Sequence, residues 1–164
     1  MMTPSDPLRS IPALLRRQAE RFPNKVFLFF KGQEVTYRQL DERTERIAEN
    51  LARFKIRPGD KVALFLPNMP EFLFAFFGAL KLGAVAVPIN TQLKGEEAVY
   101  ILQNSESRVL ITTPTLYAVI APKRSGLSML EQLFLVGERA GEGRVFSSLY
   151  VAGGSPLQRR YPAE

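Results

Sequence analysis

The sequence VALFLPNMPEFLFAFFGALKLGAVAVP, residues 62–88, decides the fold. Residues 62–66 are five consecutive apolar residues, which is typical of a strand that is covered on both faces. We expect a helix to begin at Pro70 and to end before Gly83, because proline suits the first turn of a helix and glycine suits the left-handed turn after it. Residues 85–87 are a second apolar strand. A strand, a helix and a strand in this order predict a βαβ unit of a parallel sheet.

The same alternation continues towards the carboxyl terminus. Residues 109–111 and 133–136 predict two further strands, and the four strands begin about 24 residues apart. Residues 96–104 predict a helix with acidic side chains in its first turn, where the helix dipole favours them. Pro114 and Pro122 interrupt the segment between the third and fourth strands. The sequence thus predicts an α/β protein with a partial, mostly parallel sheet flanked by helices.

A helix and a β-hairpin are expected ahead of this sheet. Residues 11–21 carry apolar side chains at helical spacing, and Pro23 ends the helix because the residue before a proline leaves the helical region. Residues 26–30 and 33–36 then form two short strands around a Lys-Gly pair, with glycine supplying the conformation that a tight turn needs.

The helix that follows the hairpin has the clearest local signature. Thr36 and Gln39 stand three residues apart and form a capping box at its start. Apolar or weakly polar side chains then recur at steps of three and four residues along one face, namely Leu40, Thr44, Ile47, Leu51 and Phe54. Residues 56–60, with the sequence IRPGD, end this helix.

The chain is basic overall, but its charge is spread along the sequence. The net charge is +6 and the isoelectric point is near 9.8. Residues 1–60 hold 12 basic and 8 acidic side chains, residues 61–120 hold four of each, and residues 121–164 hold six and four. Acids are thus interleaved with bases, whereas phosphate binding needs a basic stripe. We expect a solvated surface and no nucleic-acid partner.

Two residue types that carry much of enzyme chemistry are absent. The chain has no cysteine and no histidine, which excludes disulfides, thiolate chemistry, histidine triads and zinc sites of the usual ligand types. The amino terminus lacks the charged-then-apolar pattern of a signal peptide. The most apolar stretch, residues 72–80, is shorter than the roughly 20 residues that span a bilayer, so no transmembrane segment is expected. These features favour a cytoplasmic protein.

Two segments resemble the first two core motifs of the adenylate-forming superfamily, the AMP-dependent synthetases and ligases. VTYRQL at residues 35–40 is similar to its Thr-Tyr-x-x-Leu element, which opens a long helix. ALKLGAVAVPIN at residues 79–90 is similar to its lysine, apolar, Gly-Ala, strand and proline element, and its Pro-Ile-Asn ending looks most like acyl-CoA synthetases. Residues 57–84 resemble the family's Pro-Gly-Asp-x-Val-Ala segment, and the resemblance extends over residues 10–136.

The resemblance implies a place in a larger fold. Residues 10–149 are expected to form part of the large N-terminal domain of an acyl-CoA synthetase. A flexible amino terminus, residues 1–9, would precede this part, and a loose tail, residues 150–164, would follow it. RRYPAE at residues 159–164 resembles the lead-in to the strand before the family's phosphate-binding loop. The resemblance therefore implies an amino-terminal fragment that ends a short way before that loop.

The resemblance also implies a ligase reaction of the kind used in fatty-acid metabolism. In a complete family member a carboxylate attacks ATP to give an acyl-adenylate, and coenzyme A then displaces AMP. The cofactors implied for such a member are ATP, Mg²⁺ and coenzyme A. Its partners would be the missing remainder of the synthetase and, only in the full-length form, a carboxylic acid substrate.

This chain is expected to contribute no catalytic, cofactor-binding or metal-binding residue to that reaction. The family's ATP loop is rich in Ser, Thr and Gly and ends in lysine, because backbone amides and one cation bind the phosphates. The nearest candidate here, residues 153–156, has no lysine after it. We therefore predict that the chain alone neither binds ATP tightly nor forms an acyl-adenylate.

Four residues of the matching motifs have structural interpretations. Lys81 is expected to be a cation at the C-terminus of a helix, which is a simpler role than a catalytic one. Gly83 permits a left-handed turn and a close approach of the helix end to the next strand. Pro88 ends a strand at the carboxyl edge of the sheet, where ligands of open α/β sheets bind. Asn90, at the same edge, either caps its loop or contacts a ligand.

Two other classes of protein are alternatives. A nucleotide-binding module of Rossmann type requires Gly-x-Gly-x-x-Gly after the first strand, and residues 67–70, Pro-Asn-Met-Pro, argue against it because they contain no glycine. The second alternative is a non-catalytic interaction module from a truncated gene. Such a partial sheet would expose apolar surface and an unpaired strand edge, and it would therefore self-associate.

Overall fold

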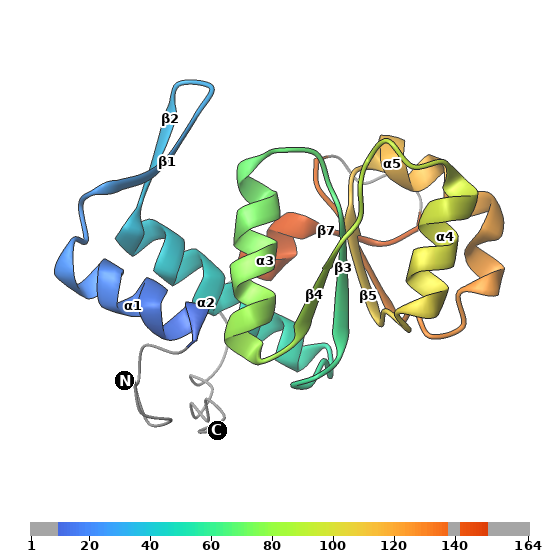
Figure 1. Cartoon of the computed structure of the whole chain (residues 1–164), viewed down its shortest axis with the longest axis horizontal. Helices are drawn as coiled ribbons and strands as arrows, with labels where there is room; N and C mark the ends of the chain where they lie inside the picture. The colour runs from blue at the N-terminus through green and yellow to red at the C-terminus, as the bar shows by residue number, and fades with distance from the viewer. Residues whose placement is uncertain (1–9, 138–141, 151–164) are drawn as a thin grey trace, which may run out of the picture.

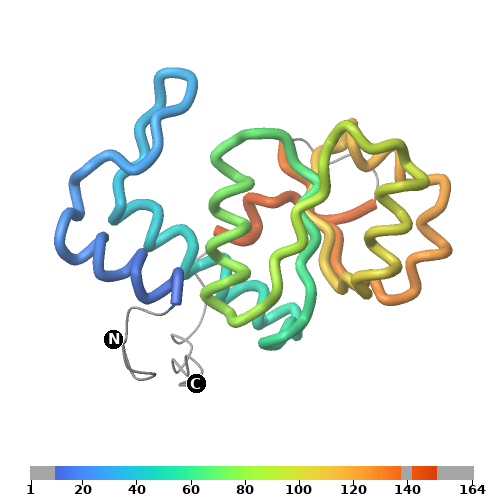
Figure 2. Tube along the Cα trace, in the orientation of Figure 1, coloured from blue at the N-terminus to red at the C-terminus, as the bar shows by residue number. Residues whose placement is uncertain are grey.

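The computed structural model describes residues 10–137 and 142–150 (Figure 1). A parallel sheet has helices on both faces, and Figure 2 shows a helix and a hairpin to one side of it. The predicted flexible segment, residues 1–9, and residues 151–164 of the predicted tail lie outside the described residues. None of the helices in the described part is long and apolar enough to cross a membrane.

Five strands form the central sheet. They are β3 Lys61–Phe65, β4 Val85–Pro88, β5 Val109–Thr112, β6 Gln132–Leu135 and β7 Arg144–Val145. Their order in space is β4-β3-β5-β6-β7, and every neighbouring pair is parallel. In this register Val62 of β3 lies opposite Ala86 of β4 and Val109 of β5. The prediction of an α/β fold with a parallel sheet is confirmed.

Helices cover both faces of the sheet and enclose two apolar clusters. They are α2 Tyr37–Arg53, α3 Pro70–Leu82, α4 Gly95–Asn104 and α5 Pro114–Ala118, with the short 3-10 helices η1 Ala121–Gly126 and η2 Phe146–Tyr150. Val62 and Leu64 of β3 pack in the cluster that contains α2, α3 and η2. Ala63 and Phe65 pack in the cluster of α4, α5 and the residues that flank η1. All four are fully buried, as the apolar run predicts for a strand covered on both faces.

The amino-terminal elements confirm the predicted helix, hairpin and capping box. They are α1 Ile11–Arg21, β1 Val26–Phe30 and β2 Gln33–Thr36, ahead of α2. In the capping box the amide of Gln39 donates to Thr36 Oγ1 over 3.3 Å, and the amide of Thr36 donates to Gln39 Oε1 over 3.0 Å. At the hairpin turn Lys31 and Gly32 have φ values of 48° and 80°, the two positive values of a type I′ turn.

The sequence does not predict β7 and η2. Phe146 and Leu149 of η2 are nevertheless buried, and Asn50 Nδ2 of α2 donates to the Leu149 carbonyl over 3.0 Å. Tyr150, the first residue of the predicted tail, packs its ring against Phe74 and Phe146 at centroid distances of 6.4 and 5.2 Å. A two-residue strand and a single helical turn are too short to show a periodic pattern, so this segment is recognisable only from its packing.

A close helix contact joins α2 and α3. Gly78 of α3 approaches α2 so closely that an added β-carbon would lie 2.5 Å from Ile47 Cγ2 and 2.8 Å from Ile47 Cβ. Ile47 is fully buried, so it has no open space into which it can move. The missing side chain of Gly78 therefore sets the distance between the two helices.

We expect Gly78→Ala to lower the free energy of unfolding by about 1–2 kcal/mol. Overpacking a buried contact costs roughly 1–3 kcal/mol, and the better helix propensity of alanine offsets at most about 1 kcal/mol of this. Gly126→Ala is the control, because a β-carbon there would lie 3.4 Å from its nearest neighbour, Gln103 Nε2. Urea unfolding measures the free energy of unfolding of the parent and of the two variants. Equal stability of Gly78→Ala and the parent would contradict the close contact.

Candidate functional site

The carboxyl edge of the sheet is the candidate site. β3 lies between β4 and β5, so the chain leaves β3 towards one side of the sheet and later returns on the other side. At such a reversal of strand order the two loops separate, and ligands of open α/β sheets bind in the crevice between them. We define the switch-point edge as residues 66–69, which follow β3, and residues 113–114, which follow β5.

Side-chain hydrogen bonds fix the backbone at the switch-point edge. Thr112 is fully buried, and its hydroxyl donates to the Phe65 carbonyl of the neighbouring strand over 2.8 Å. The hydroxyl of Thr113 accepts from the amide of Leu116 over 3.2 Å and so caps α5. The two loops therefore start from a rigid frame.

Asn90 follows β4 at the same edge of the sheet and caps its loop. Its side-chain oxygen accepts from the amide of Gln92 over 3.0 Å, and the residue is exposed. One residue earlier, the amide of Ile89 donates to the Leu64 carbonyl over 2.9 Å, which extends the pairing with β3. This geometry agrees with the loop-capping interpretation of Asn90, and a ligand contact stays a prediction.

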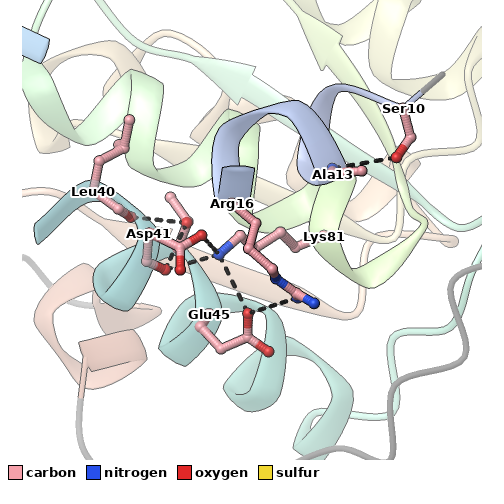
Figure 3. Close-up of polar contacts among 8 residues, drawn as sticks. Ser10, Ala13, Arg16, Leu40, Asp41, Glu45 and Lys81 are labelled. Carbon is pink, nitrogen blue, oxygen red and sulfur yellow. Dashed lines mark hydrogen bonds and ion pairs between the residues drawn. The ribbon is translucent and has the colours of Figure 1, made fainter. Parts of the chain in front are cut away.

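Lys81 lies in the last turn of α3, as the sequence predicts, and its buried ammonium joins α3 to α2 (Figure 3). Its side chain is 1% exposed. Its ammonium donates to the Asp41 carbonyl over 2.8 Å, to the Asp41 carboxylate over 2.6 Å and to the Glu45 carboxylate over 3.2 Å. Lysine has three N–H donors, and these contacts use all of them. The sequence shows the charge at the helix end but not its partners, which lie 40 and 36 residues earlier.

Arg16 brings α1 into the same cluster. Its Nη2 atom lies 4.0 Å from Glu45 Oε2, and Figure 3 shows Arg16 and Lys81 on either side of that carboxylate. We refer to Arg16, Asp41, Glu45 and Lys81 as the three-helix cluster. Because the Lys81 ammonium is buried between helices and fully bonded, this cluster positions α3 and does not reach towards a ligand at the sheet edge.

A second ionic cluster ties the opposite, amino edge of the sheet. Arg108 precedes β5, and its guanidinium donates twice to Glu131, which precedes β6, over 2.9 and 2.6 Å. A further donor of Arg108 bonds Asp60, which precedes β3. The hydrogen bond from Arg108 lowers the pKa of Glu131, and the same bond raises the pKa of Arg108. Sequence reasoning missed this cluster, although all three residues stand directly before strands whose amino ends meet at one edge.

A third polar cluster lies beside α5. The Tyr117 hydroxyl donates to the Glu142 carboxylate over 2.8 Å, and Arg124 Nε donates to the same carboxylate over 3.0 Å. Burial, and then the hydrogen bond to Glu142, raise the pKa of Tyr117 to about 12. The phenol therefore stays protonated at neutral pH and acts as a hydrogen-bond donor, not as a base.

The switch-point edge does not by itself fit the phosphates of ATP. The turn after β3 contains Pro67 and Pro70, which have no amide donor, whereas a phosphate-binding turn presents successive amides. Within residues 10–137 and 142–150, no group of three or more acidic side chains lies close enough to hold a metal ion. The expectation that this chain lacks catalytic and cofactor-binding residues stays a prediction.

The sequence matches one family model and several curated relatives. The profile of the family described as AMP-binding enzyme matches residues 15–147. The crotonobetaine/carnitine–CoA ligase of Salmonella paratyphi A is 40% identical over 127 residues, which are 74% of this chain and 25% of that protein. The chain thus spans about a quarter of the length of the curated relatives it matches.

Solved structures of CoA ligases share the fold. The anthranilate–CoA ligase AuaEII, in complex with anthranoyl-AMP, has a TM-score of 0.84 and 34% identity over 91% of this chain and 29% of that chain. A fatty acyl-CoA synthetase of Mycobacterium tuberculosis has a TM-score of 0.71 and 35% identity over 78% of this chain and 26% of that chain. The sheet and its helices therefore agree with the N-terminal domain of such ligases, as the two motifs predict.

Removing the buried ammonium should destabilise the fold far more than removing an exposed one. We expect Lys81→Met to lower the free energy of unfolding by about 2–3 kcal/mol, because hydrogen bonds to charged groups are lost inside a helix interface. Lys123→Met is the matched control, since Lys123 is 48% exposed and pairs with Glu96, which is 80% exposed. Its urea midpoint should hardly change. Similar midpoints for the two variants would show that the three-helix cluster does not hold α3.

Proposed function

Because this chain belongs to the AMP-binding enzyme family, we propose that it is the amino-terminal part of an adenylate-forming acid–CoA ligase. One observation carries the proposal: the family match over residues 15–147 includes every strand of the sheet and the helices that connect them. Relatives similar over this region are named as CoA ligases, one for crotonobetaine or carnitine and one for anthranilate.

The proposed reaction of the whole protein has two steps. A carboxylate oxygen attacks the α-phosphorus of ATP and pyrophosphate leaves, which forms an acyl-adenylate. The thiol of coenzyme A then attacks the acyl carbon and displaces AMP, which gives the thioester. Mg²⁺ and positioned cations would stabilise the charge that develops on the phosphates. A relative in complex with anthranoyl-AMP, an acyl-adenylate, supports this order of steps.

The substrate class in this proposal is an organic carboxylic acid. The names of the relatives include a carnitine-type acid, an aromatic acid and fatty acids, and a role in fatty-acid metabolism is one member of this range. The absence of cysteine supports a reducing compartment, and we place the reaction in the cytoplasm.

This chain supplies framework to the reaction in our proposal, and the reacting groups come from polypeptide beyond it. The framework is the switch-point edge, with α3 held in place by the three-helix cluster. We propose that the chain alone neither binds ATP tightly nor forms an acyl-adenylate. The prolines in the turn after β3 support this, as does the absence from the sequence of a Ser/Thr/Gly-rich segment followed by lysine.

The remainder of the synthetase is the partner that α3 requires. The helix, PEFLFAFFGALKL, has two charged residues, and one of them, Lys81, is turned towards α2. A helix that is apolar all round is normally buried all round, yet Phe72, Phe76 and Phe77 are only partly buried. Their rings form a row, with centroid distances of 6.2 Å between Phe72 and Phe76 and 5.5 Å between Phe76 and Phe77. Such a row suits contact with further apolar protein surface.

We expect the purified chain to catalyse no exchange of pyrophosphate into ATP with any of a panel of fatty and aromatic acids. The longer protein that contains this chain should catalyse the exchange with at least one acid of the panel. Exchange by the chain alone would contradict its framework role. Failure of the folded longer protein with every acid would contradict the ligase proposal itself.

A non-catalytic, self-associating module is the second candidate function, and the edge of the sheet favours it. In the described part of the chain, β4 pairs with β3 alone, so its other edge is open. Val85 at the start of β4 is 47% exposed. An open edge with an exposed apolar side chain accepts a strand from another chain. Pro88 limits such pairing to the first residues of β4, because proline has no amide to donate.

Val85→Lys should shift the chain towards the monomer if the β4 edge mediates self-association, because a charge on an edge strand opposes strand pairing. Val119→Lys is the matched control, since Val119 is also 47% exposed but lies at the end of α5, outside the sheet. Sedimentation velocity measures the distribution of species. A parent chain that is monomeric at all concentrations, or an equal response of both variants, would exclude pairing through this edge.

A further inference from the structure

The amino-terminal helix and hairpin combine exposed apolar side chains with a basic charge. Residues 10–38 hold six basic and two acidic side chains. Nine large apolar side chains are exposed in the described part of the chain, and five of them lie between residues 11 and 29. These five are Ile11, Leu14, Phe22, Val26 and Phe29. Both features are therefore concentrated in one small part of the molecule.

One side of α1 carries both features. Ile11, Leu14, Arg17 and Arg21 recur at steps of three and four residues, so they share a side of the helix. Ile11 and Leu14 are 50% and 47% exposed, and both arginines are exposed as well. A different side of α1, with Leu15, is buried in the core. The solvent side of this helix is thus apolar and cationic at once.

The turn after α1 continues the pattern. Phe22 is 39% exposed, and the Arg21 guanidinium carbon and the Lys25 ammonium lie 5.0 and 5.6 Å from the centroid of its ring. Phe29 of β1 is 68% exposed on the hairpin, which projects away from the sheet in Figure 1. The residue opposite Phe29 is the exposed Glu34, and the Lys31 ammonium lies over the ring of Phe30, so the strands of the hairpin do not continue the pattern. We define the α1–hairpin face as the exposed residues of α1 and of the turn that leads into the hairpin, namely Ile11, Leu14, Arg17, Arg21, Phe22 and Lys25.

We propose that the α1–hairpin face binds the surface of an anionic lipid bilayer. Apolar side chains of an interfacial helix insert at the level of the headgroups, and its Lys and Arg residues contact the lipid phosphates. Juxtaposed cations add attraction to anionic lipids, and salt screens that attraction. This proposal is independent of the ligase proposal, which assigns no role to these residues.

Charge and apolar exposure together select this partner. A nucleic acid would be held by the cations but would gain nothing from exposed Ile11 and Leu14. An apolar protein segment would cover Ile11 and Leu14 but would offer no counter-charge to Arg17, Arg21 and Lys25. A bilayer with anionic headgroups uses both kinds of side chain in one contact.

Co-sedimentation of the purified chain with vesicles tests the proposal. We expect binding to phosphatidylcholine vesicles that contain about 30% phosphatidylglycerol, and at least a roughly tenfold weaker partition onto pure phosphatidylcholine. Sodium chloride at about 0.5 M should weaken binding to the anionic vesicles by a similar factor. Equal partition onto neutral and anionic vesicles, or binding that salt does not change, would overturn the proposal.

Two pairs of variants separate this face from general charge and general apolar exposure. Arg17→Gln with Arg21→Gln should weaken binding roughly tenfold or more, whereas Arg57→Gln with Lys94→Gln removes the same charge from exposed sites elsewhere and should have little effect. Leu14→Ser should weaken binding, whereas Met129→Ser, at a site with a similar exposure of 48%, should not. All six substitutions are at partly or fully exposed positions, so melting temperatures should be retained.

The control variants and a DNA competitor define the results that would overturn the proposal. Equal losses for the two double variants, or for the two serine variants, would overturn the assignment of binding to the α1–hairpin face. Short duplex DNA that displaces the chain from anionic vesicles at equal phosphate concentration would identify a general polyanion site and would also overturn the proposal.

Discussion

The contact between α2 and α3 is the constraint on which the rest of this structure depends. Gly78 lets the two helices approach until Ile47 fills the space between them, and Lys81 bonds Asp41 and Glu45 further along the same interface. Because α3 is also the crossover between β3 and β4, its position constrains the pairing of these strands. β3 lies inside the sheet, so a shift of α3 would move the loops that begin the switch-point edge.

The two edges of the sheet are held together by different kinds of hydrogen bond. At the amino edge Arg108 ties the starts of three strands with charged hydrogen bonds to Asp60 and Glu131. At the carboxyl edge the buried hydroxyl of Thr112 donates to the Phe65 carbonyl and so joins β5 to β3. The proposed reaction between an acid and a nucleoside triphosphate requires that both are held in one geometry, and we propose that this rigid frame helps to hold them.

The sequence predicts those parts of the fold that local patterns encode. Residues 62–66 read as a buried strand, and Thr36 with Gln39 as a capping box, because strand burial and capping are decided within a few residues. The partners of Lys81 and Arg108 could not be predicted in this way, since they lie 23 to 48 residues distant and meet only when helices and strands pack. The α1–hairpin face could not be predicted from the sequence for another reason. A charge count over residues 1–60 includes the acids of α2, and two of these, Asp41 and Glu45, bond Lys81 in the folded protein.

We propose that this chain is a framework that other polypeptide completes, and a chimera tests that idea most directly. Residues 15–147 would replace the matching region of the Salmonella crotonobetaine/carnitine–CoA ligase, and pyrophosphate exchange would be measured with the acid of that enzyme. We predict exchange at a rate within about tenfold of the parent ligase, because the reacting groups would come from the retained part. A chimera that melts cooperatively like the parent but forms no acyl-adenylate would contradict the account.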